Sequence, residues 1–182
     1  LMHYALPVFV DSDRETFQID HRKLREAITP ATKVIMPVHL GGAMSEMDEI
    51  MAAAQENNVA VIEDACQAHL AEWRGKKSGT IGKGGCFSFQ GSKNLNSGEG
   101  GAIVSNDDDF IENCYAFHNN GCGRRTNSYN FSYTSNGSNL RMTEFQGALL
   151  LAQMRRVEAQ SSTRERNARY LTQQLSKIEG IT

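Results

Sequence analysis

The sequence predicts an α/β protein, in which a mainly parallel sheet is connected by helical crossovers. Short apolar runs alternate along the 182 residues with segments whose apolar residues recur at helical spacing. The run at 59–65 is apolar almost throughout and ends in two acids. Such continuity is typical of a parallel strand that is buried on both faces of its sheet.

The first part of the chain alternates strands and helices. Asp20 stands where the N-cap of a first helix is expected, and Ser45 with Asp48 has the residue types of a capping pair for a second helix. Two glycines follow the strand that ends at His39 and favour a turn there. The expected order is strand 7–11, helix 20–28, strand 33–39, helix 45–58 and strand 59–65.

Two strands and two helices are expected in the second part. Thr143 and Gln146 are spaced as a capping box, so a long helix begins there. Its arginines favour a surface that faces solvent or another subunit. The expected order is strand 86–89, strand 101–105, helix 108–118 and the long helix. The chain is therefore divided into a core at 1–142 and a helix at 143–182 that leads toward a small further domain.

Composition argues against several classes of function. The formal net charge is -2, and no lysine and arginine block accompanies an aromatic platform, so no nucleic-acid partner is expected. No apolar run is long enough for a membrane span and no signal segment opens the chain, which predicts a cytoplasmic protein. The four cysteines include no CxxC pair, so we expect free thiols and no metal site. The abrupt start predicts a fragment.

Polar residues follow three of the expected strands: His39, the pair Glu63–Asp64 and the loop at 90–96. Ligands of open parallel sheets bind beyond the carboxyl ends of the strands. The loop holds one lysine, Lys93, among small polar residues. A lysine amine that is held in place and partly desolvated can attack an aldehyde to form a Schiff base. The alternative is a surface charge, which describes most loop lysines.

Asp64 and Ser88 have the residue types that would complete such a site. A carboxylate at Asp64 could accept a hydrogen bond from a protonated pyridine nitrogen, which keeps the ring charged as an electron sink. The alternative for Asp64 is an N-cap role. Ser88 alternates with Phe87 and Phe89, so its hydroxyl faces away from them and could hold a phosphate oxygen. The alternative for Ser88 is a buried serine bonded to the backbone.

Several separated stretches carry a resemblance to a known family. They are VFVDSDRETFQID, ITPATKVIMPVHLGG, VIEDACQAHLAEWRGKKSGTIGKGGCFSFQGSKNLNSGEGGAIVSND and GSNLRMTEFQGALLLAQM. In this order they resemble the DegT/DnrJ/EryC1/StrS family of pyridoxal-phosphate-dependent sugar aminotransferases, over essentially the whole chain. The resemblance implies the large domain of a fold-type I transferase, with a mainly parallel sheet between helices. It also implies a homodimer with shared active sites.

By motif match, the resemblance assigns roles to five residues. Lys93 is implied to form the Schiff base with pyridoxal 5'-phosphate, and Asp64 to pair with its pyridine nitrogen. Gln67 is implied to lie against the cofactor ring, Ser88 to bind the phosphate, and Asn139 to reach the phosphate of the neighbouring subunit. The site prediction therefore consists of one catalytic residue, Lys93, and the cofactor-binding set Lys93, Asp64, Gln67, Ser88 and Asn139.

Some positions depart from the family pattern or keep two interpretations. His39 matches the family's VH histidine and either lines the site or is a strand-end histidine bonded to the backbone. Leu70 stands where glycine is usual, so the turn after His69 must accept a side chain. FSFQ and GEGG favour a subgroup that includes scyllo-inosose aminotransferases and aminohydroxybenzoate synthases. The chain is shorter than family members, so parts of the cofactor and substrate sites are expected outside it.

The implied reaction is a ping-pong transamination, in which Lys93 holds the cofactor and then moves a proton. The expected amino donor is glutamate or glutamine, and the expected acceptor is a nucleotide-linked keto sugar. Two alternatives remain for the function. The enzyme is an aminotransferase of scyllo-inosose, or it is similar to an aminohydroxybenzoate synthase. Lys93 argues against a dehydratase, because such relatives carry histidine there. A non-enzymatic regulatory relative and an inactive fragment are the remaining hypotheses.

Overall fold

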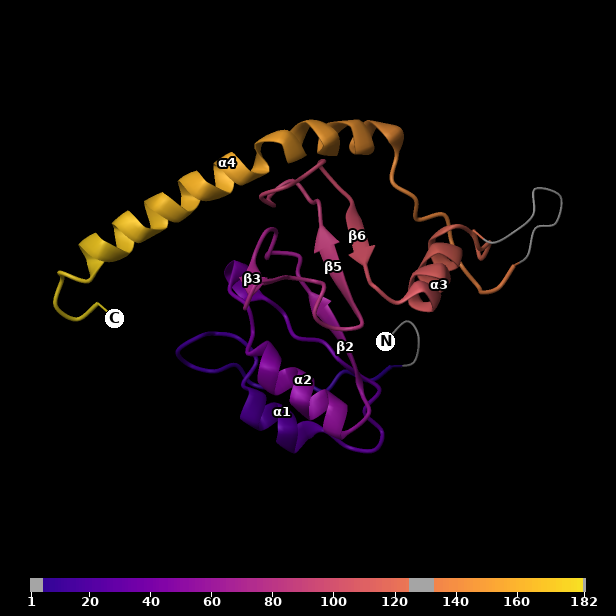
Figure 1. Ribbon diagram of the computed structural model, residues 1–182, viewed down its shortest axis with the longest axis horizontal. Coiled ribbons are helices and arrows are strands. Elements are labelled where there is room, and N and C mark those ends of the chain that lie inside the picture. Colours follow the sequence, from indigo (N-terminus) through magenta and orange to yellow (C-terminus); the bar gives the residue numbers. More distant parts are fainter. Residues whose placement is uncertain (1–4, 125–132, 182) are drawn as a thin grey trace.

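The computed structural model describes residues 5–124 and 133–181, as a central sheet with helices packed beside it (Figure 1). The helices are α1 (His21–Ala27), α2 (Met47–Glu56), α3 (Asp108–His118) and α4 (Glu144–Leu175). The strands are β1 (Val34–Ile35), β2 (Ala60–Asp64), β3 (Glu72–Trp73), β4 (Lys76–Lys77), β5 (Gly84–Ser88) and β6 (Gly101–Val104), and a short 3-10 turn, η1, covers Leu40–Gly42.

Four strands form the main sheet in the order β1, β2, β5 and β6. The first three run parallel, and β6 returns antiparallel to β5. Asp20 caps α1, and Thr143 with Gln146 forms the capping box that begins α4, as predicted. Apart from residues at their ends, the elements predicted at 20–28, 45–58, 59–65, 86–89, 101–105 and 108–118 are confirmed. The strand predicted at 33–39 forms only at Val34–Ile35, and Val38 adds an isolated bridge with Asp64.

The cap predicted for α2 is wrong. Glu46 precedes this helix and makes no side-chain cap bond. Ser45 is fully buried, and its hydroxyl donates to the Val38 carbonyl oxygen over 3.3 Å. Its backbone N–H donates to Nδ1 of His39 over 3.2 Å. The residue types at 45 and 48 match a cap, but tertiary contacts of Ser45 take its polar groups elsewhere.

The strand predicted at 7–11 is not formed in the described part of the chain. Ser12 makes an isolated bridge with Ile19, but residues 7–11 pair with no neighbouring strand. Val8 and Phe9 are 72% and 91% exposed. An apolar run needs a partner for its backbone groups before it becomes a strand. The β3–β4 hairpin was not predicted, because two-residue strands are too short to show a period.

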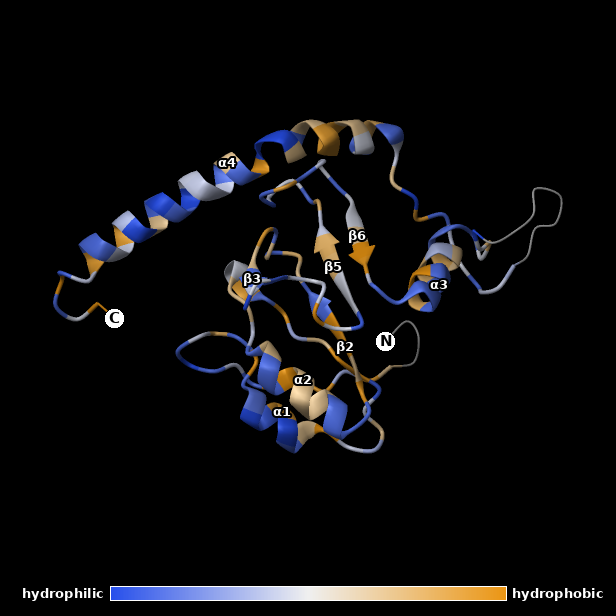
Figure 2. Cartoon of the chain, viewed as in Figure 1, coloured by the Kyte–Doolittle hydropathy of each residue, from blue (hydrophilic) through white to orange (hydrophobic). Residues whose placement is uncertain are grey.

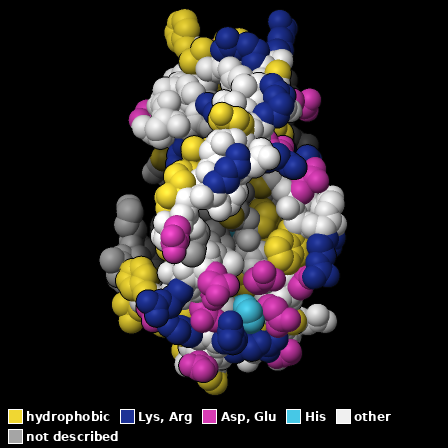
Figure 3. Space-filling view, turned by 90° about the vertical axis from the view of Figure 1, so that its left-hand side faces the viewer, with side chains coloured by type: hydrophobic (Ala, Val, Ile, Leu, Met, Phe, Trp, Pro, Cys, Tyr) yellow, Lys and Arg dark blue, Asp and Glu magenta, His cyan; other side chains and the backbone are white. Residues whose placement is uncertain are grey.

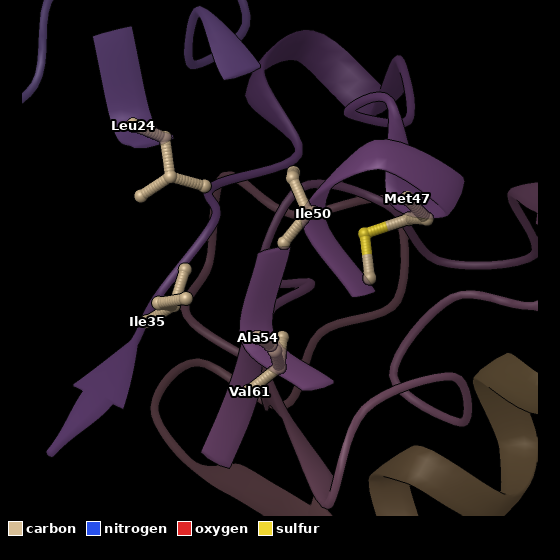
Figure 4. Close-up of a cluster of buried hydrophobic side chains, with 6 residues drawn as sticks. All are labelled: Leu24, Ile35, Met47, Ile50, Ala54 and Val61. Atoms are coloured by element: carbon tan, nitrogen blue, oxygen red, sulfur yellow. The ribbon is translucent and has the colours of Figure 1, made fainter. Parts of the chain in front are cut away.

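The main hydrophobic core lies between the sheet and the pair α1 and α2. Its buried members are Leu24, Ile35, Met47, Ile50, Ala54 and Val61 (Figure 4). In the register, Ile35 pairs with Val61, so both side chains face the helices from adjacent strands. Burial of each large aliphatic side chain contributes about 1.5–3 kcal/mol. This cluster therefore holds the helical layer against β1 and β2.

The opposite face of the sheet is only partly covered by the described residues. Phe110 of α3 packs against Gly84 of β5 so closely that a Cβ at this glycine would lie 2.7 Å from the ring. Gly84 is therefore required for the approach of α3. Nearer β1 the same face is open, and Val34, Met36 and Val38 are 49%, 57% and 41% exposed.

The 32-residue helix α4 extends beyond the rest of the chain (Figure 1). Leu150 and Val157 are buried, and both belong to its first half. Figure 2 shows hydrophobic residues near its start and mostly hydrophilic residues toward its end. Exposed hydrophobic side chains stand among charged ones on the face of the molecule drawn in Figure 3. Among the described helices, none is long and apolar enough to cross a membrane.

A buried carboxylate joins three segments of the chain. Glu63 of β2 is fully buried. Its Oε2 accepts hydrogen bonds from Nε2 of His39 at 3.1 Å and from the Gly79 N–H at 2.8 Å. Its Oε1 accepts the N–H groups of Ile81 and Gly82, each at 2.7 Å. Glu63 therefore links the segment that follows β1 and the turn before β5 to β2.

The same bonds determine the charge state of Glu63. Burial by itself would raise the pKa of this carboxyl, because it disfavours the charged form. The bonds from His39 and from three backbone N–H groups outweigh burial and hold the pKa below its usual range. Nδ1 of His39 accepts the Ser45 N–H, so the proton lies on Nε2 and is donated to Glu63.

Leu70 occupies the turn that follows His69. Its φ is +67°, in the left-handed region that disfavours residues with a Cβ. The turn is held by the Ala71 N–H, which donates to the Ala68 carbonyl oxygen over 3.0 Å. Ser78 closes it with a hydroxyl bond to the same oxygen over 2.6 Å. The prediction that the turn after His69 accommodates a side chain is therefore confirmed, but the backbone of Leu70 is strained.

Glu63→Gln should lower the free energy of unfolding by about 3 kcal/mol, because buried N–H groups lose a charged acceptor. Urea unfolding at pH 7 measures this. The exposed Glu46→Gln is the matched control and should change it by less than about 0.5 kcal/mol. Because the folded pKa is depressed, the stability from Glu63 is present above the unfolded pKa of about 4.3 and lost as pH falls below it. Equal stability of the two variants would contradict the assignment.

Leu70→Gly should raise the free energy of unfolding by about 1 kcal/mol, because glycine relieves the left-handed strain by more than it adds to unfolded-chain entropy. Thermal and urea unfolding measure the change. Leu70→Ala keeps the Cβ and serves as the control, with no comparable gain. A glycine variant less stable than the alanine variant would show that the turn is unstrained.

Candidate active site

The candidate site lies at the carboxyl ends of β2 and β5. Asp64 is the last residue of β2, and Ser88 is the last residue of β5. Asp64 pairs with Cys86 across the two strands, so these two side chains lie on one face. Ser88, two residues beyond Cys86, shares that face. Val61 and Glu63 point toward the α1 and α2 layer. Asp64, Cys86 and Ser88 therefore lie on the opposite face of the sheet.

Asp64 caps the turn that leaves β2. Its Oδ1 accepts the backbone N–H of Cys66 at 3.1 Å, although no helix follows. An ionised carboxylate can accept several hydrogen bonds, so this contact leaves capacity for another donor. Burial, followed by the neighbouring Asp64 carboxylate, raises the pKa of the Cys66 thiol to about 11. The thiol therefore stays protonated near neutral pH and is no nucleophile beside Asp64.

Ser88 is half-buried at the end of β5, where the chain enters the loop that carries Lys93. Its Oγ accepts the Gln90 N–H over 3.3 Å. A serine hydroxyl can accept and donate at the same time, so its hydrogen can still be donated to an anionic oxygen. The neighbouring Phe87 faces the other side of β5, as the alternation predicted, and its ring contacts His69.

Lys93 and Gln67 line one cavity of about 270 Å³. The other lining residues are Gly41, His69, Ser92 and Asn94. Oε1 of Gln67 accepts the Gly41 N–H over 2.7 Å, which fixes the amide against η1. Lys93 is half-buried. The structure thus brings together two predicted residues that are distant in sequence, in a polar cavity beside the ends of β2 and β5.

His69 is a residue of this cavity that the sequence did not single out. Its ring lies 5.5 Å from Phe87 and 6.1 Å from Phe89, centroid to centroid. Burial lowers the pKa of His69. The backbone of Ser88 raises this pKa by a smaller amount, and the charge of Lys93 lowers it further. Within the described chain, neither ring nitrogen has a hydrogen-bond partner at normal geometry. The imidazole is therefore neutral near pH 7.

Asp64 and Ser88 end β2 and β5 without lining the cavity, and His39 and Asn139 also lie outside it. His39 is fully buried and bonds to Glu63 and Ser45, which favours its strand-end interpretation over a site-lining one. Asn139 is exposed and forms an antiparallel bridge with Asn119 near the end of α3. Neither is a lining residue of the cavity. Of the five predicted site residues, Gln67 and Lys93 therefore line the cavity, whereas Asp64 and Ser88 lie at the strand ends and Asn139 lies beside Asn119.

Comparisons with known proteins identify the family and the fold of this chain. The model of the DegT/DnrJ/EryC1/StrS aminotransferase family matches residues 2–182. A GDP-perosamine synthase from Caulobacter vibrioides is 42% identical over 96% of this chain and 46% of its own length. An L-glutamine:2-deoxy-scyllo-inosose aminotransferase from Streptomyces lividus is 38% identical over 92% of this chain and 41% of its own.

A solved structure gives the same result for the fold. The crystal structure of 3-amino-5-hydroxybenzoic acid synthase is 36% identical and superposes with a TM-score of 0.88. It covers 97% of this chain, which in turn covers 46% of that protein. The chain thus spans less than half the length of these relatives, and its fold is that of fold-type I transferases. The protein belongs to the DegT/DnrJ/EryC1/StrS aminotransferase family.

Proposed function

We propose that the protein is a pyridoxal-phosphate-dependent aminotransferase that moves an amino group from glutamate or glutamine to the ketone of a sugar or cyclitol. The observation that carries this proposal is the position of Lys93. It lies half-buried in a polar cavity with Gln67, next to the strand ends that present Asp64 and Ser88 on one face. Membership of an aminotransferase family supports it.

The chemical groups at this end of the sheet fit pyridoxal phosphate. The Lys93 amine suits the aldehyde, the Asp64 carboxylate suits a protonated ring nitrogen, and the Ser88 hydroxyl suits a phosphate oxygen. The Gln67 amide, fixed by Gly41, would lie against the ring. When bound, the cofactor supplies an electron sink for the bond changes at the substrate.

The chain's own residues then have separate tasks. Lys93 holds the cofactor and, once released, moves a proton to and from the substrate carbon. The Asp64 carboxylate keeps the ring nitrogen protonated. Ser88 orients the phosphate. In the proposed homodimer, Asn139 reaches the phosphate of the neighbouring subunit, in agreement with its exposed position outside the Lys93 cavity. The protein acts in the cytoplasm, without a nucleic-acid or membrane partner.

The acceptor in this proposal is a nucleotide-linked keto sugar, with a free cyclitol ketone as the second candidate. GDP-perosamine synthase represents the first class among the relatives, and the scyllo-inosose aminotransferase represents the second. Gln67, Ser92 and Asn94 line the cavity beside Lys93, so it offers hydrogen bonds to hydroxyl groups. Turnover measured with a panel of nucleotide-keto sugars and with scyllo-inosose, using glutamate and glutamine in turn as the amino donor, distinguishes the two acceptor classes.

Lys93→Ala should abolish cofactor attachment and turnover. Sodium borohydride should trap a covalent adduct at Lys93 in the wild-type complete protein incubated with pyridoxal phosphate, and mass spectrometry locates it. Absorbance near the visible edge should disappear in the variant, because no other group supplies an amine in the cavity lining.

Lys76→Ala is the matched control, because Lys76 is exposed on β4 and outside the cavity lining. This variant should keep the adduct, the absorbance and the turnover of the wild type. The proposed function would be contradicted if the Lys93→Ala protein still transaminated, or if the wild-type adduct formed at another lysine.

A further inference from the structure

Lys93 stands in an irregular loop, at 89–100, between β5 and β6. Loops hold reacting groups less rigidly than strands and helices do, so the supporting bonds of the loop decide where the lysine lies. Ser92, Asn94 and the flanking glycines are exposed and pack against little. Lys93 itself is half-buried, so its position depends on hydrogen bonds within the loop as well as on burial.

The two ends of the loop are joined to each other. The Phe89 N–H donates to the Gly100 carbonyl oxygen over 2.8 Å, and the Ser97 N–H donates to the Phe89 carbonyl oxygen over 2.9 Å. From outside, Nε2 of Gln146 donates to the Glu99 carbonyl oxygen over 3.0 Å. The base of the loop is thus fixed by the sheet and by the first turn of α4.

The tip of the loop is held by bonds to Lys93 itself. The Lys93 N–H donates to the Gln90 carbonyl oxygen over 2.9 Å. Nδ2 of Asn96 donates to the Lys93 carbonyl oxygen over 2.9 Å. Asn96 is half-buried, and Gln90 also receives the Ser92 N–H and hydroxyl through its side-chain oxygen. Both backbone polar groups of Lys93 are therefore bonded within the loop, one of them by a side chain.

We propose that Asn96 is a positioning residue for Lys93. This rests on the proposed function, in which Lys93 Nζ forms a C=N bond with the cofactor's aldehyde carbon and the aldehyde oxygen leaves as water. By fixing the Lys93 carbonyl, the Asn96 amide holds the peptide from which the lysine side chain extends. Without this donor the loop tip samples more conformations, and the amine meets the aldehyde carbon less often.

Asn96→Thr and Asn96→Val test the proposal. The threonine and valine side chains have the same shape, but only threonine has a hydroxyl donor. A threonine hydroxyl can bond a carbonyl three residues earlier, whereas valine cannot. The rate of adduct formation with pyridoxal phosphate, followed by absorbance and by borohydride trapping, is measured in the complete protein. Valine should be slower than threonine by about tenfold, the kinetic equivalent of one hydrogen bond.

Asn57→Ala is the control for losing such a bond elsewhere. Nδ2 of Asn57 donates to the Ala53 carbonyl oxygen over 2.8 Å at the end of α2, away from the loop. This variant should lose stability and keep the wild-type adduct rate. Equal rates for the Asn96→Val and Asn96→Thr proteins, or an equal slowing by Asn57→Ala, would overturn the positioning role. A wild-type protein that forms no adduct at Lys93 would instead refute the proposed function itself.

Discussion

The ionised carboxylate of Glu63 is the interaction on which the geometry of the candidate site depends. Glu63 lies inside the protein and accepts four hydrogen bonds, from His39 and from the backbone of 79–82. A buried charge is tolerated only when it is bonded in this way. The segments that supply the bonds are the stretch after β1, which leads through His39 into η1, and the turn that leads into β5. Both are therefore drawn to β2 at the level where the cavity opens.

Adjacent acids at the end of β2 have different tasks because a strand alternates its faces. Glu63 points toward the α1 and α2 layer and holds the chain together. Asp64 points to the other face, beside Cys86 and near Ser88. The same alternation separates Phe87 and Phe89, which pack around His69, from Ser88. A shift of the register by one residue would exchange these tasks and destroy both the core and the site.

The cavity is assembled from loops that rest on this frame. Gly41 of η1 fixes Gln67, and Gln146 of α4 holds the far side of the Lys93 loop. These bonds join residues that lie far apart in the sequence. Leu70 shows the same dependence in another form, since the turn imposes a left-handed conformation on a residue that disfavours it. The tertiary contacts of this turn therefore override the backbone preference of leucine.

The sequence by itself determined the class of fold, most strands and helices and the family resemblance, because periodicity and motif order are local properties of a chain. It also supplied the predicted site residues Asp64, Gln67, Ser88, Lys93 and Asn139. It misjudged 7–11, where a strand needs a partner, and Ser45, whose polar groups bond to His39 and Val38. The tertiary structure alone decided that His39 supports Glu63, that His69 belongs to the cavity, and that Asn96 and Gln146 hold the Lys93 loop. Hydrogen bonds of this kind depend on distance in space, which spacing along a chain does not encode.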